Sequence, residues 1–513
     1  MIMELKNMIN TLSVAAVALL ATACNDTDAQ YDIPEVGAPQ FVSATPATSE
    51  PLFFGEQTFT VTFDKNIGFA TANASKITLN GTPVKQALVL GAAPTLTINA
   101  DVDFKKTQNL VIPAGLIVGP QGIPYTEEIN LTWSIGNLPS NDATAITQKL
   151  GWGWNLGNHF DTSGDAIKNG WGYWDGVDRM TAAPFQTLAA VGAKTLRLPV
   201  TWTDHMDEGN VINPDYLNEV AAAVDLAIGA GLNVIINTHH DSFETDLGNA
   251  ANDANVAKAD SALIASLWTQ VATRFASYGD QLIFETFNEV HAGDNWGGGS
   301  DAEYALLNQW NQYAVNAIRA TGAGNANRWI AVAGYAANID LTLDHFVLPN
   351  DPANRLIVAV HSYDPYNFCL APETSGVSSW GHNADPAHSV AGANEEYVIK
   401  QLYKLRTAYI EKGIPCYLGE YGCVWQTTGR ANAFRKYYLE FFCRAAYLAG
   451  IPMFIWDNNA TGSGNEANGY LSHATGEWYN DAETVVPMMV KACTNTDDSY
   501  WFDTIWNNSP AAE

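Results

Sequence analysis

The sequence predicts an α/β protein in which a (β/α)8 TIM barrel follows a small all-β domain. Two observations lead to this prediction. Before about residue 136, short stretches alternate polar and apolar residues with period two and are punctuated by Gly, Pro and Asn-Gly, as in a β-sandwich. From about residue 143 onward, short apolar runs alternate with segments of helical spacing, as in repeated βα units. A doubly wound open sheet is the alternative for this second part.

The first 24 residues have the features of an export signal. Lys6 precedes an apolar run over residues 12–21, and small residues lead directly to Cys24. A basic start, a short apolar run and a small-residue cleavage site are typical of a secretory signal peptide, and this run is too short to span a bilayer. The pattern resembles a bacterial lipoprotein signal, which implies that Cys24 is lipidated; a plain signal cut nearby is the alternative. We expect residues 25–40 to be a polar tether.

Export of this kind predicts where the protein resides. We expect it at the cell surface, attached to the bacterial outer membrane through the lipid on Cys24 and touching the membrane in no other way. Free secretion and a periplasmic location are the alternatives.

Residues 41–136 are predicted to form the β-sandwich. Its strands are expected at residues 59–63, 77–79, 96–98, 110–112 and 129–133. The stretch from residue 43 to residue 67 resembles the bacterial Ig-like modules of surface and secreted proteins. It carries no site chemistry, so the expected role is a spacer, and a carbohydrate-binding module is the alternative. Residues 136–142, rich in Gly, Asn, Pro and Ser, are expected to link it to the next domain.

The barrel is predicted over residues 143–510. Its eight strands are expected at residues 152–158, 196–200, 233–237, 281–285, 329–333, 356–360, 416–419 and 453–456. Between them lie helical patterns: apolar residues from 217 to 228 recur at helical spacing and stop before Gly231, and a second helix around residues 397–405 stops before Gly413.

The composition limits the possible partners. The formal net charge of −29 makes the surface repel nucleic acid and anionic lipid, and it suits an uncharged partner such as a polysaccharide, although solubility alone explains the charge equally well. Sixteen tryptophans are compatible with rings that line a wet cleft and stack on sugars, or with an aromatic core. The six cysteines lack the spacing of a zinc site or a disulfide scaffold; one disulfide among the last five and free buried thiols both remain open.

Two glutamates stand at the ends of predicted strands, where the active site of a TIM barrel lies. Glu289 follows the fourth strand and Glu420 ends the seventh. Opposite strands of a narrow barrel point such side chains across its mouth. Glycosidic cleavage needs one carboxylic acid to protonate the leaving oxygen and one carboxylate on the other side of the anomeric carbon. An ion pair, for instance with Arg197, would explain one glutamate, but two of them within polar clusters indicate glycoside hydrolysis.

Further polar and aromatic residues at the strand ends are predicted to support these carboxylates. Arg197 can lower the pKa of a neighbouring carboxyl group, Asn288 can bond a sugar hydroxyl, and Trp456 can stack on the sugar. The other candidates for substrate contact are Asn158, Trp174, His239, His240, Trp296, His361 and Tyr363. One of the two adjacent histidines is expected to point away. Additional tryptophans that could line a long cleft are Trp152, Trp154, Trp171, Trp202, Trp380 and Trp425.

Six short motifs resemble glycoside hydrolase family 5 of the cellulase type. They are residues 154–158 (WNLGN), 196–200 (LRLPV), 237–241 (NTHHD), 287–289 (FNE), 361–363 (HSY) and 418–422 (LGEYG). The resemblance implies a (β/α)8 retaining enzyme without a cofactor, with Glu289 as acid/base and Glu420 as nucleophile. Arg197, His239, Asn288, His361, Tyr363 and Trp456 would be the supporting residues.

One departure from the family pattern lies beside the acid/base position. Pro usually follows that glutamate, whereas this chain has Val290-His291 and then a Gly-rich segment that carries Trp296. The segment leaves the chemistry of the two glutamates intact, but it weakens any transfer of substrate preference.

The predicted function is endo-hydrolysis of a β-1,4-glucan such as cellulose, mixed-linkage glucan or xyloglucan, by a monomer without metal. A β-mannanase with the same residues is the enzyme alternative, and a surface glycan-binding protein on an inactive barrel is the alternative from another class. A metal-dependent hydrolase is a third possibility because of His239, His240 and Asp241, but no third carboxylate or histidine at ligand spacing accompanies them.

Overall fold

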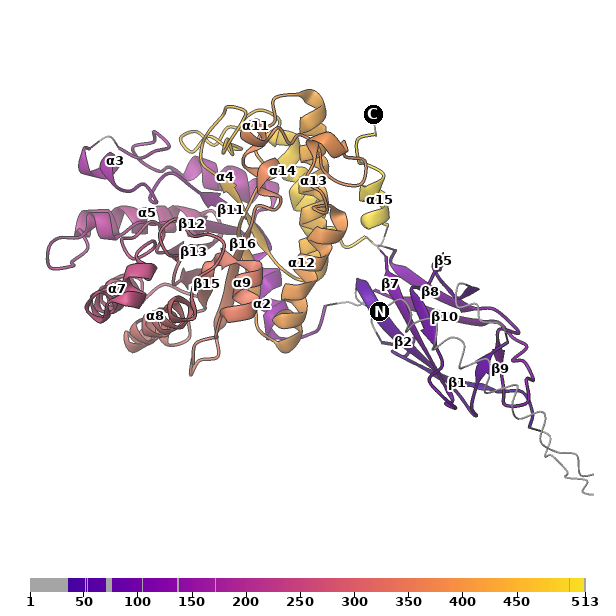
Figure 1. Ribbon diagram of the computed structural model, residues 1–513. Helices are drawn as coiled ribbons and strands as arrows, with labels where there is room; N and C mark the ends of the chain where they lie inside the picture. Colours follow the sequence, from indigo (N-terminus) through magenta and orange to yellow (C-terminus); the bar gives the residue numbers. More distant parts are fainter. Residues whose placement is uncertain are drawn as a thin grey trace, which may run out of the picture.

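The computed structural model describes residues 36–511, apart from residues 51, 53, 71–75, 104, 136–137, 171 and 498. The predicted signal segment, its lipidation site at Cys24 and most of the tether therefore lie outside the described residues. The described chain has two parts, a pair of sheets toward the N-terminus and a larger barrel that continues to the C-terminus (Figure 1). This confirms the predicted fold class, a TIM barrel preceded by an all-β region.

The N-terminal part consists mainly of two antiparallel four-stranded sheets, ordered β1-β2-β7-β6 and β10-β8-β4-β5. The strands are β1 (Phe41–Thr45), β2 (Gly55–Phe63), β4 (Thr78–Leu79), β5 (Thr82–Pro83), β6 (Gln86–Leu88), β7 (Thr95–Val102), β8 (Thr107–Ile112) and β10 (Ile129–Ser134), with β3 (Gly68–Phe69) and β9 (Ile117–Val118) as a separate pair. Along β2 every second residue from Phe59 to Phe63 is buried. These side chains share one core with Leu110 and Trp133 of the other sheet, so the two sheets form a sandwich.

The second part is a closed barrel of eight strands in sequence order. The strands are β11 (Trp152–Leu156), β12 (Thr195–Leu198), β13 (Asn233–Asn237), β14 (Leu282–Glu285), β15 (Ile330–Asn338), β16 (Leu356–Ser362), β17 (Cys416–Tyr421) and β18 (Met453–Asp457). All neighbours pair in parallel, and β11 closes on β18. The register between β16 and β17 shifts just before His361, which places His361 opposite Glu420. Such irregularities re-aim side chains next to active sites.

Helices surround the barrel. They are α2 (Asp142–Leu150), α3 (Asp165–Lys168), α4 (Ala182–Val191), α5 (Pro214–Gly229), α6 (Leu247–Asn252), α7 (Ala254–Arg274), α8 (Asp301–Ala320), α9 (Ile339–His345), α10 (Tyr366–Cys369), α11 (Pro372–Ser375), α12 (Glu395–Ala408), α13 (Gly429–Ala449), α14 (Ala482–Thr494) and α15 (Phe502–Trp506). The two helices predicted from spacing are α5 and α12. Local capping residues determine where helices begin. Asn213 caps α5, with Pro214 at its first position, and Ser300 with Glu303 forms a capping box on α8.

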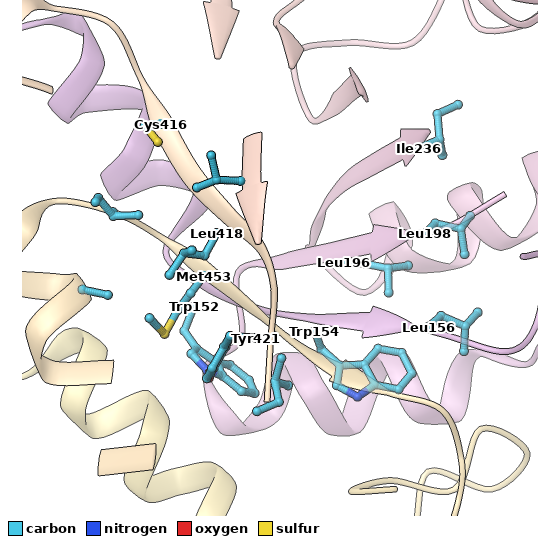
Figure 2. Close-up of a cluster of buried hydrophobic side chains, with 14 of the residues drawn as sticks. Trp152, Trp154, Leu156, Leu196, Leu198, Ile236, Cys416, Leu418, Tyr421 and Met453 are labelled. Atoms are coloured by element: carbon cyan, nitrogen blue, oxygen red, sulfur yellow. The ribbon is translucent and has the colours of Figure 1, made fainter. Parts of the chain in front are cut away.

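Side chains of the barrel strands alternate between two apolar layers. Ile235 and Ile283 point into the barrel interior, whereas Val234 and Ile236 pack outward against the helices. Figure 2 shows the outward layer, with Trp152 of β11 among the labelled side chains of β11, β12, β13, β17 and β18. The strands are therefore buried on both faces, which is why they read as continuous apolar runs in the sequence.

Four tryptophans that the sequence offered as cleft residues belong to this core instead. Trp152, Trp154, Trp202 and Trp380 are at most 1% exposed. Three of the indole N–H groups have internal acceptors: Trp152 donates to the Tyr421 hydroxyl (2.7 Å), Trp154 to Asp457 (2.9 Å) and Trp202 to a backbone carbonyl (2.7 Å). Because a buried indole needs such a partner, these contacts explain how the rings are accommodated, and the prediction that they line a cleft is wrong.

The sandwich lies beside α12 and α15 of the barrel (Figure 1). Phe54, immediately before β2, makes edge-to-face contacts with Tyr403 of α12 (centroids 5.0 Å apart) and Phe502 of α15 (5.5 Å). Trp501 packs against the apolar cores of both parts. Aromatic contacts therefore join the two parts directly.

The five cysteines of the barrel are free thiols, namely Cys369, Cys416, Cys423, Cys443 and Cys493. The disulfide that the sequence left open is thus not formed among the described residues. Within the same part of the chain, no helix combines the length and apolar character needed to cross a bilayer.

Candidate active site

The two glutamates meet at one end of the barrel. Glu289 lies four residues beyond β14, Glu420 lies in β17, and His361 of the intervening β16 stands between them. One carboxylate oxygen of each glutamate and a ring nitrogen of His361 all lie within 4.8 Å of one another. Strands β14 and β17 are three positions apart in the barrel. The closure of the sheet therefore brings together two side chains that are more than a hundred residues apart in sequence.

Arg197 is the central residue of the polar network around these carboxylates. Its side chain is fully buried, and it donates to Glu420 (2.7 Å), Glu285 (2.6 Å) and Asn288 (2.9 Å). A further bond goes to Asn155 (2.9 Å). A buried guanidinium is tolerated only when its donors and its charge are satisfied, and two carboxylates and two amides do so here. The planar fork of Arg197 thereby fixes Glu420 and Asn288 relative to each other.

Glu420 is held from two sides. Arg197 donates to one of its oxygens, and the Tyr363 hydroxyl donates to the other (2.9 Å). Burial raises the pKa of Glu420 above the ordinary glutamate value, while Arg197 and the Tyr363 hydroxyl act in the opposite direction. Arg197 thus lowers this pKa as the sequence predicts, but burial outweighs it.

Glu289 has the more strongly shifted proton affinity. Burial, followed by the negative charge of Glu244, raises the pKa of Glu289 to about 7. The Nδ1 atom of His361 lies 2.6 Å from its Oε1. Burial lowers the pKa of His361 to about 4, so this imidazole is neutral at pH 7. At neutral pH, Glu289 can therefore both hold and release a proton, as a general acid/base must.

The structure also describes three further predicted residues, His239, Trp456 and Asn158. His239 lies parallel to Trp456, with ring centroids 5.8 Å apart and planes 5° apart, and Trp456 is only partly buried. The Asn237 amide lies 3.2 Å from His239 Nδ1 and orients the ring. Asn158 adopts a left-handed backbone conformation (φ 62°) in which its N–H donates to Asp161. The ring pair of His239 and Trp456 offers flat surfaces against which a sugar can pack.

Two exposed tryptophans flank the site. Trp174 is 46% exposed, with its ring centroid 5.9 Å from that of His240. Trp296 is 52% exposed and packs against His291 in a tilted arrangement, with centroids 3.9 Å apart. Large exposed aromatic side chains that are supported by a neighbouring ring suit contact with a ligand. Of the further tryptophan candidates, Trp425 is partly buried. Trp171 lies outside the described residues.

Three site residues were not singled out from the sequence: Glu285, Tyr417 and Glu244. Glu285 bonds Arg197, and Tyr417 donates to Glu285 (2.5 Å). Glu244 accepts a hydrogen bond from Asn288 (3.0 Å). A signal existed for Glu285, because an acidic residue inside an otherwise apolar barrel strand requires a buried cation as partner. Glu244 stands in a loop and gave no such signal.

A third potential metal ligand lies beside the two adjacent histidines, contrary to the expectation from spacing. Asp161, His239 and His240 each place a ligand-type atom within 4.8 Å of the others. Asp241 is turned away and accepts from the backbone N–H groups of Trp202 and Thr203. Although burial opposes it, Glu244 raises the pKa of His240 to about 9. A histidine must be neutral to bind a metal, so this protonation disfavours a metal here.

A buried ion-pair chain connects the loop that carries Trp174 to the end of strand β18, which carries Trp456. His473 Nδ1 lies 2.9 Å from Asp175, which follows Trp174, and His473 Nε2 lies 3.3 Å from Asp457, which follows Trp456. Both carboxylates and the imidazole are buried. Although burial opposes it, the two aspartates raise the pKa of His473 to about 9. The charged histidine therefore ties together the segments that present Trp174 and Trp456.

We expect His473→Gln to destabilise the fold in a pH-dependent way. The folded-state pKa of about 9 exceeds the unfolded value of roughly 6.5, so the stabilisation is complete below about pH 6.5 and is lost as the pH rises through 9. The loss in the free energy of unfolding should be about 2–3 kcal/mol at pH 6 and should shrink above pH 9. Urea unfolding of both proteins from pH 6 to pH 10 measures it. The exposed His388→Gln variant is the control, and a pH-independent difference would contradict the ion-pair chain.

Comparisons with known proteins agree with this geometry. Residues 157–462 match the family model described as Cellulase (glycosyl hydrolase family 5). Endoglucanase A of Clostridium longisporum is 32% identical over 66% of this chain, which spans 63% of that relative, and Endoglucanase B of Clostridium cellulovorans is 34% identical over 66% of this chain and 73% of its own length.

Solved structures give the same result. A Bacteroidetes-affiliated GH5 cellulase linked with a polysaccharide utilization locus is 35% identical with a TM-score of 0.69, covering 73% of this chain and 99% of its own. A GH5-4 broad specificity endoglucanase from Bacteroides salanitronis is 41% identical with a TM-score of 0.66, covering 70% and 97%. The family resemblance that the motifs predicted is confirmed.

Proposed function

This chain belongs to glycosyl hydrolase family 5, the cellulase family, and we propose that it is a retaining endo-β-1,4-glucanase that cleaves β-glucans by double displacement. One observation carries the proposal: an oxygen of Glu289 and an oxygen of Glu420 lie within 4.8 Å of each other. Retaining glycosidases place their carboxyl groups about 5–5.5 Å apart, whereas inverting enzymes leave about 6.5–9.5 Å for a water molecule. The short separation supports direct attack by a carboxylate.

The surroundings of the two glutamates support different roles for them. Glu420 receives hydrogen bonds from Arg197 and Tyr363, which stabilise its ionised form and aim it at the anomeric carbon. Glu289, with a pKa of about 7, gives its proton to the leaving sugar oxygen as Glu420 attacks. It then removes a proton from the water that hydrolyses the glycosyl-enzyme. Asn288, fixed by Arg197, would bond the sugar 2-hydroxyl.

The substrate class is inferred from relatives and from the exposed rings. The related structures include a lichenase from Caldicellulosiruptor in complex with cellotetraose and several broad specificity endoglucanases. Exposed Trp174, beside His240, and exposed Trp296, beside His291, offer aromatic faces in addition to Trp456. A site with several platforms suits attack within a long chain, so cellulose, mixed-linkage glucan and xyloglucan are the proposed substrates.

The location and the N-terminal parts are proposed from the sequence. The chain would be exported and attached to the outer membrane through a lipid on Cys24, and it would act as a monomer on a polysaccharide. Two antiparallel sheets around one core are compatible with an Ig-like module that serves as a spacer. Labelling of intact cells with palmitate, comparing the native chain with Cys24→Ala, tests the anchor. Equal labelling of both proteins would contradict it.

The test of function combines a substrate panel with product stereochemistry. We expect residues 25–513 to hydrolyse carboxymethyl-cellulose, barley β-glucan or xyloglucan, with viscosity falling faster than reducing ends appear. Proton NMR during cleavage should show the β-anomer first, because double displacement retains configuration. The α-anomer first would exclude this mechanism, activity on mannan alone would overturn the substrate class, and binding without cleavage would indicate a glycan-binding protein.

A further inference from the structure

Glu244 is a buried carboxylate beside the reacting centre that neither attacks the sugar nor transfers a proton in the mechanism proposed above. It lies in the loop between β13 and α6, and its side chain is 8% exposed. Its backbone is fixed at both ends: its N–H donates to the Asp241 carbonyl (2.8 Å), and its carbonyl accepts from the His291 N–H (2.9 Å). Burial of a charge costs free energy unless the charge is paired and hydrogen-bonded, so the partners of this carboxylate indicate what it does.

The two carboxylate oxygens have different partners. Oε1 accepts a hydrogen bond from the Asn288 amide (3.0 Å), and Oε2 lies 3.0 Å from Nδ1 of His240. Asn288 immediately precedes Glu289 in the chain. Glu244 therefore touches the residue next to the acid/base through one oxygen and a protonated histidine through the other.

Glu244 and Arg197 together determine which way the Asn288 amide points. Arg197 donates to the Asn288 oxygen (2.9 Å), and Glu244 accepts from the Asn288 nitrogen (3.0 Å). A flipped amide would place its oxygen against a carboxylate and its NH2 group against a guanidinium. In the observed orientation one N–H of the amide remains available for a sugar hydroxyl.

We propose that Glu244 is a positioning residue for this reaction: it fixes the donor orientation of the Asn288 amide and places a negative charge beside Glu289, while His240 partly balances that charge. The inference rests on the proposed glycosidase function. It also gives His240 a different role from the substrate contact predicted from sequence, since its Nδ1 is directed to Glu244.

Glu244 and His240 act on the pKa of Glu289 together with the other charges around it. Glu289 is faced by Glu244 and His240 from the segment after β13, by Arg197 of β12 and by His291 of its own loop. His361, Tyr363 and Glu420 approach from β16, the segment after it and β17. Among the charges acting on Glu289, Glu244 is the one that raises its pKa most, whereas Arg197, His240 and His291 lower it. Removal of Glu244 and removal of His240 should thus have opposite effects on the pKa of Glu289.

The experiment compares pH profiles of kcat/KM on barley β-glucan for Glu244→Gln and His240→Asn. The alkaline limb reports the free-enzyme pKa of the acid/base. We expect His240→Asn to move it toward alkali. We expect Glu244→Gln to move it toward acid, by less than the loss of the Glu244 charge alone would, because His240 also loses the contact that keeps it protonated. Glu477→Gln, at an exposed position, is the control and should not move it. Thermal unfolding shows that each variant is folded, and if Glu244→Gln does not fold, the direction of the His240→Asn shift decides.

The outcomes separate this inference from the proposed function. Limbs that stay in place, or that move in the same direction in both variants, would overturn the role of Glu244 while leaving the glycosidase intact. A wild-type protein without hydrolytic activity would instead overturn the proposed function. Loss of kcat in Glu244→Gln with KM unchanged would further support the orientation of Asn288, because the bond to the 2-hydroxyl strengthens in the transition state.

Discussion

Replacing Glu420 with Ala is expected to lower kcat on barley β-glucan by about 10⁴-fold or more, since loss of a catalytic nucleophile has effects of this order. The variant lacks the group that attacks the anomeric carbon, and Arg197 and Tyr363 lose their shared acceptor. Arg197 retains Glu285 as a buried counter-ion, so the protein should remain folded. Initial rates and thermal unfolding of the variant measure both expectations, with Glu477→Gln as the matched control.

Added azide distinguishes a nucleophile from other essential residues. In Glu420→Ala the small anion can enter the vacated space and attack the anomeric carbon from the same side as the missing carboxylate. With an activated aryl β-cellobioside the product should then be the α-glycosyl azide, because a single displacement inverts configuration. Formation of the β-azide, or a residual activity of more than one tenth of wild type, would show that Glu420 is not the nucleophile.

Replacing Glu289 with Ala is expected to have an effect that depends on the leaving group. On barley β-glucan, whose leaving sugar requires a proton, kcat/KM should fall by about 10²–10⁴-fold. On an aryl β-cellobioside with a strongly acidic phenol, which leaves without protonation, the loss in kcat/KM should be at least tenfold smaller. The alkaline limb that the Glu289 pKa of about 7 imposes should disappear.

The same azide experiment gives the opposite stereochemistry for this variant. In Glu289→Ala the glycosyl-enzyme on Glu420 still forms from an activated substrate, and azide then displaces it to give the β-glycosyl azide. An equal loss of activity on the glucan and on the aryl substrate would contradict the acid/base role. The two alanine variants thus assign the two glutamates independently of each other.

The sequence by itself determined the eight barrel strands, five strands of the sandwich, two helices and the position of the two glutamates. Period-two alternation predicted the strands of the sandwich, and strands buried on both faces read as apolar runs, such as residues 233–237. Glycines such as Gly231 predicted where helices end. In a parallel barrel every strand delivers its C-terminal end to the same rim, so Glu289 and Glu420 could be placed near each other without knowledge of any contact.

The contacts between side chains were decided only by the tertiary structure. Whether a tryptophan belongs to the core or contacts a ligand depends on which face of its element it occupies and on what covers it, so both Trp154 and Trp174 were candidates for the cleft. Glu244 reaches Asn288 across 44 residues, and Asp175 reaches His473 across 298. Such pairs depend on barrel closure and strand register, which local periodicity does not encode. The sequence therefore predicts the type of reaction, whereas the contacts between charged groups that set the pKa values of the catalytic residues form only in the folded barrel.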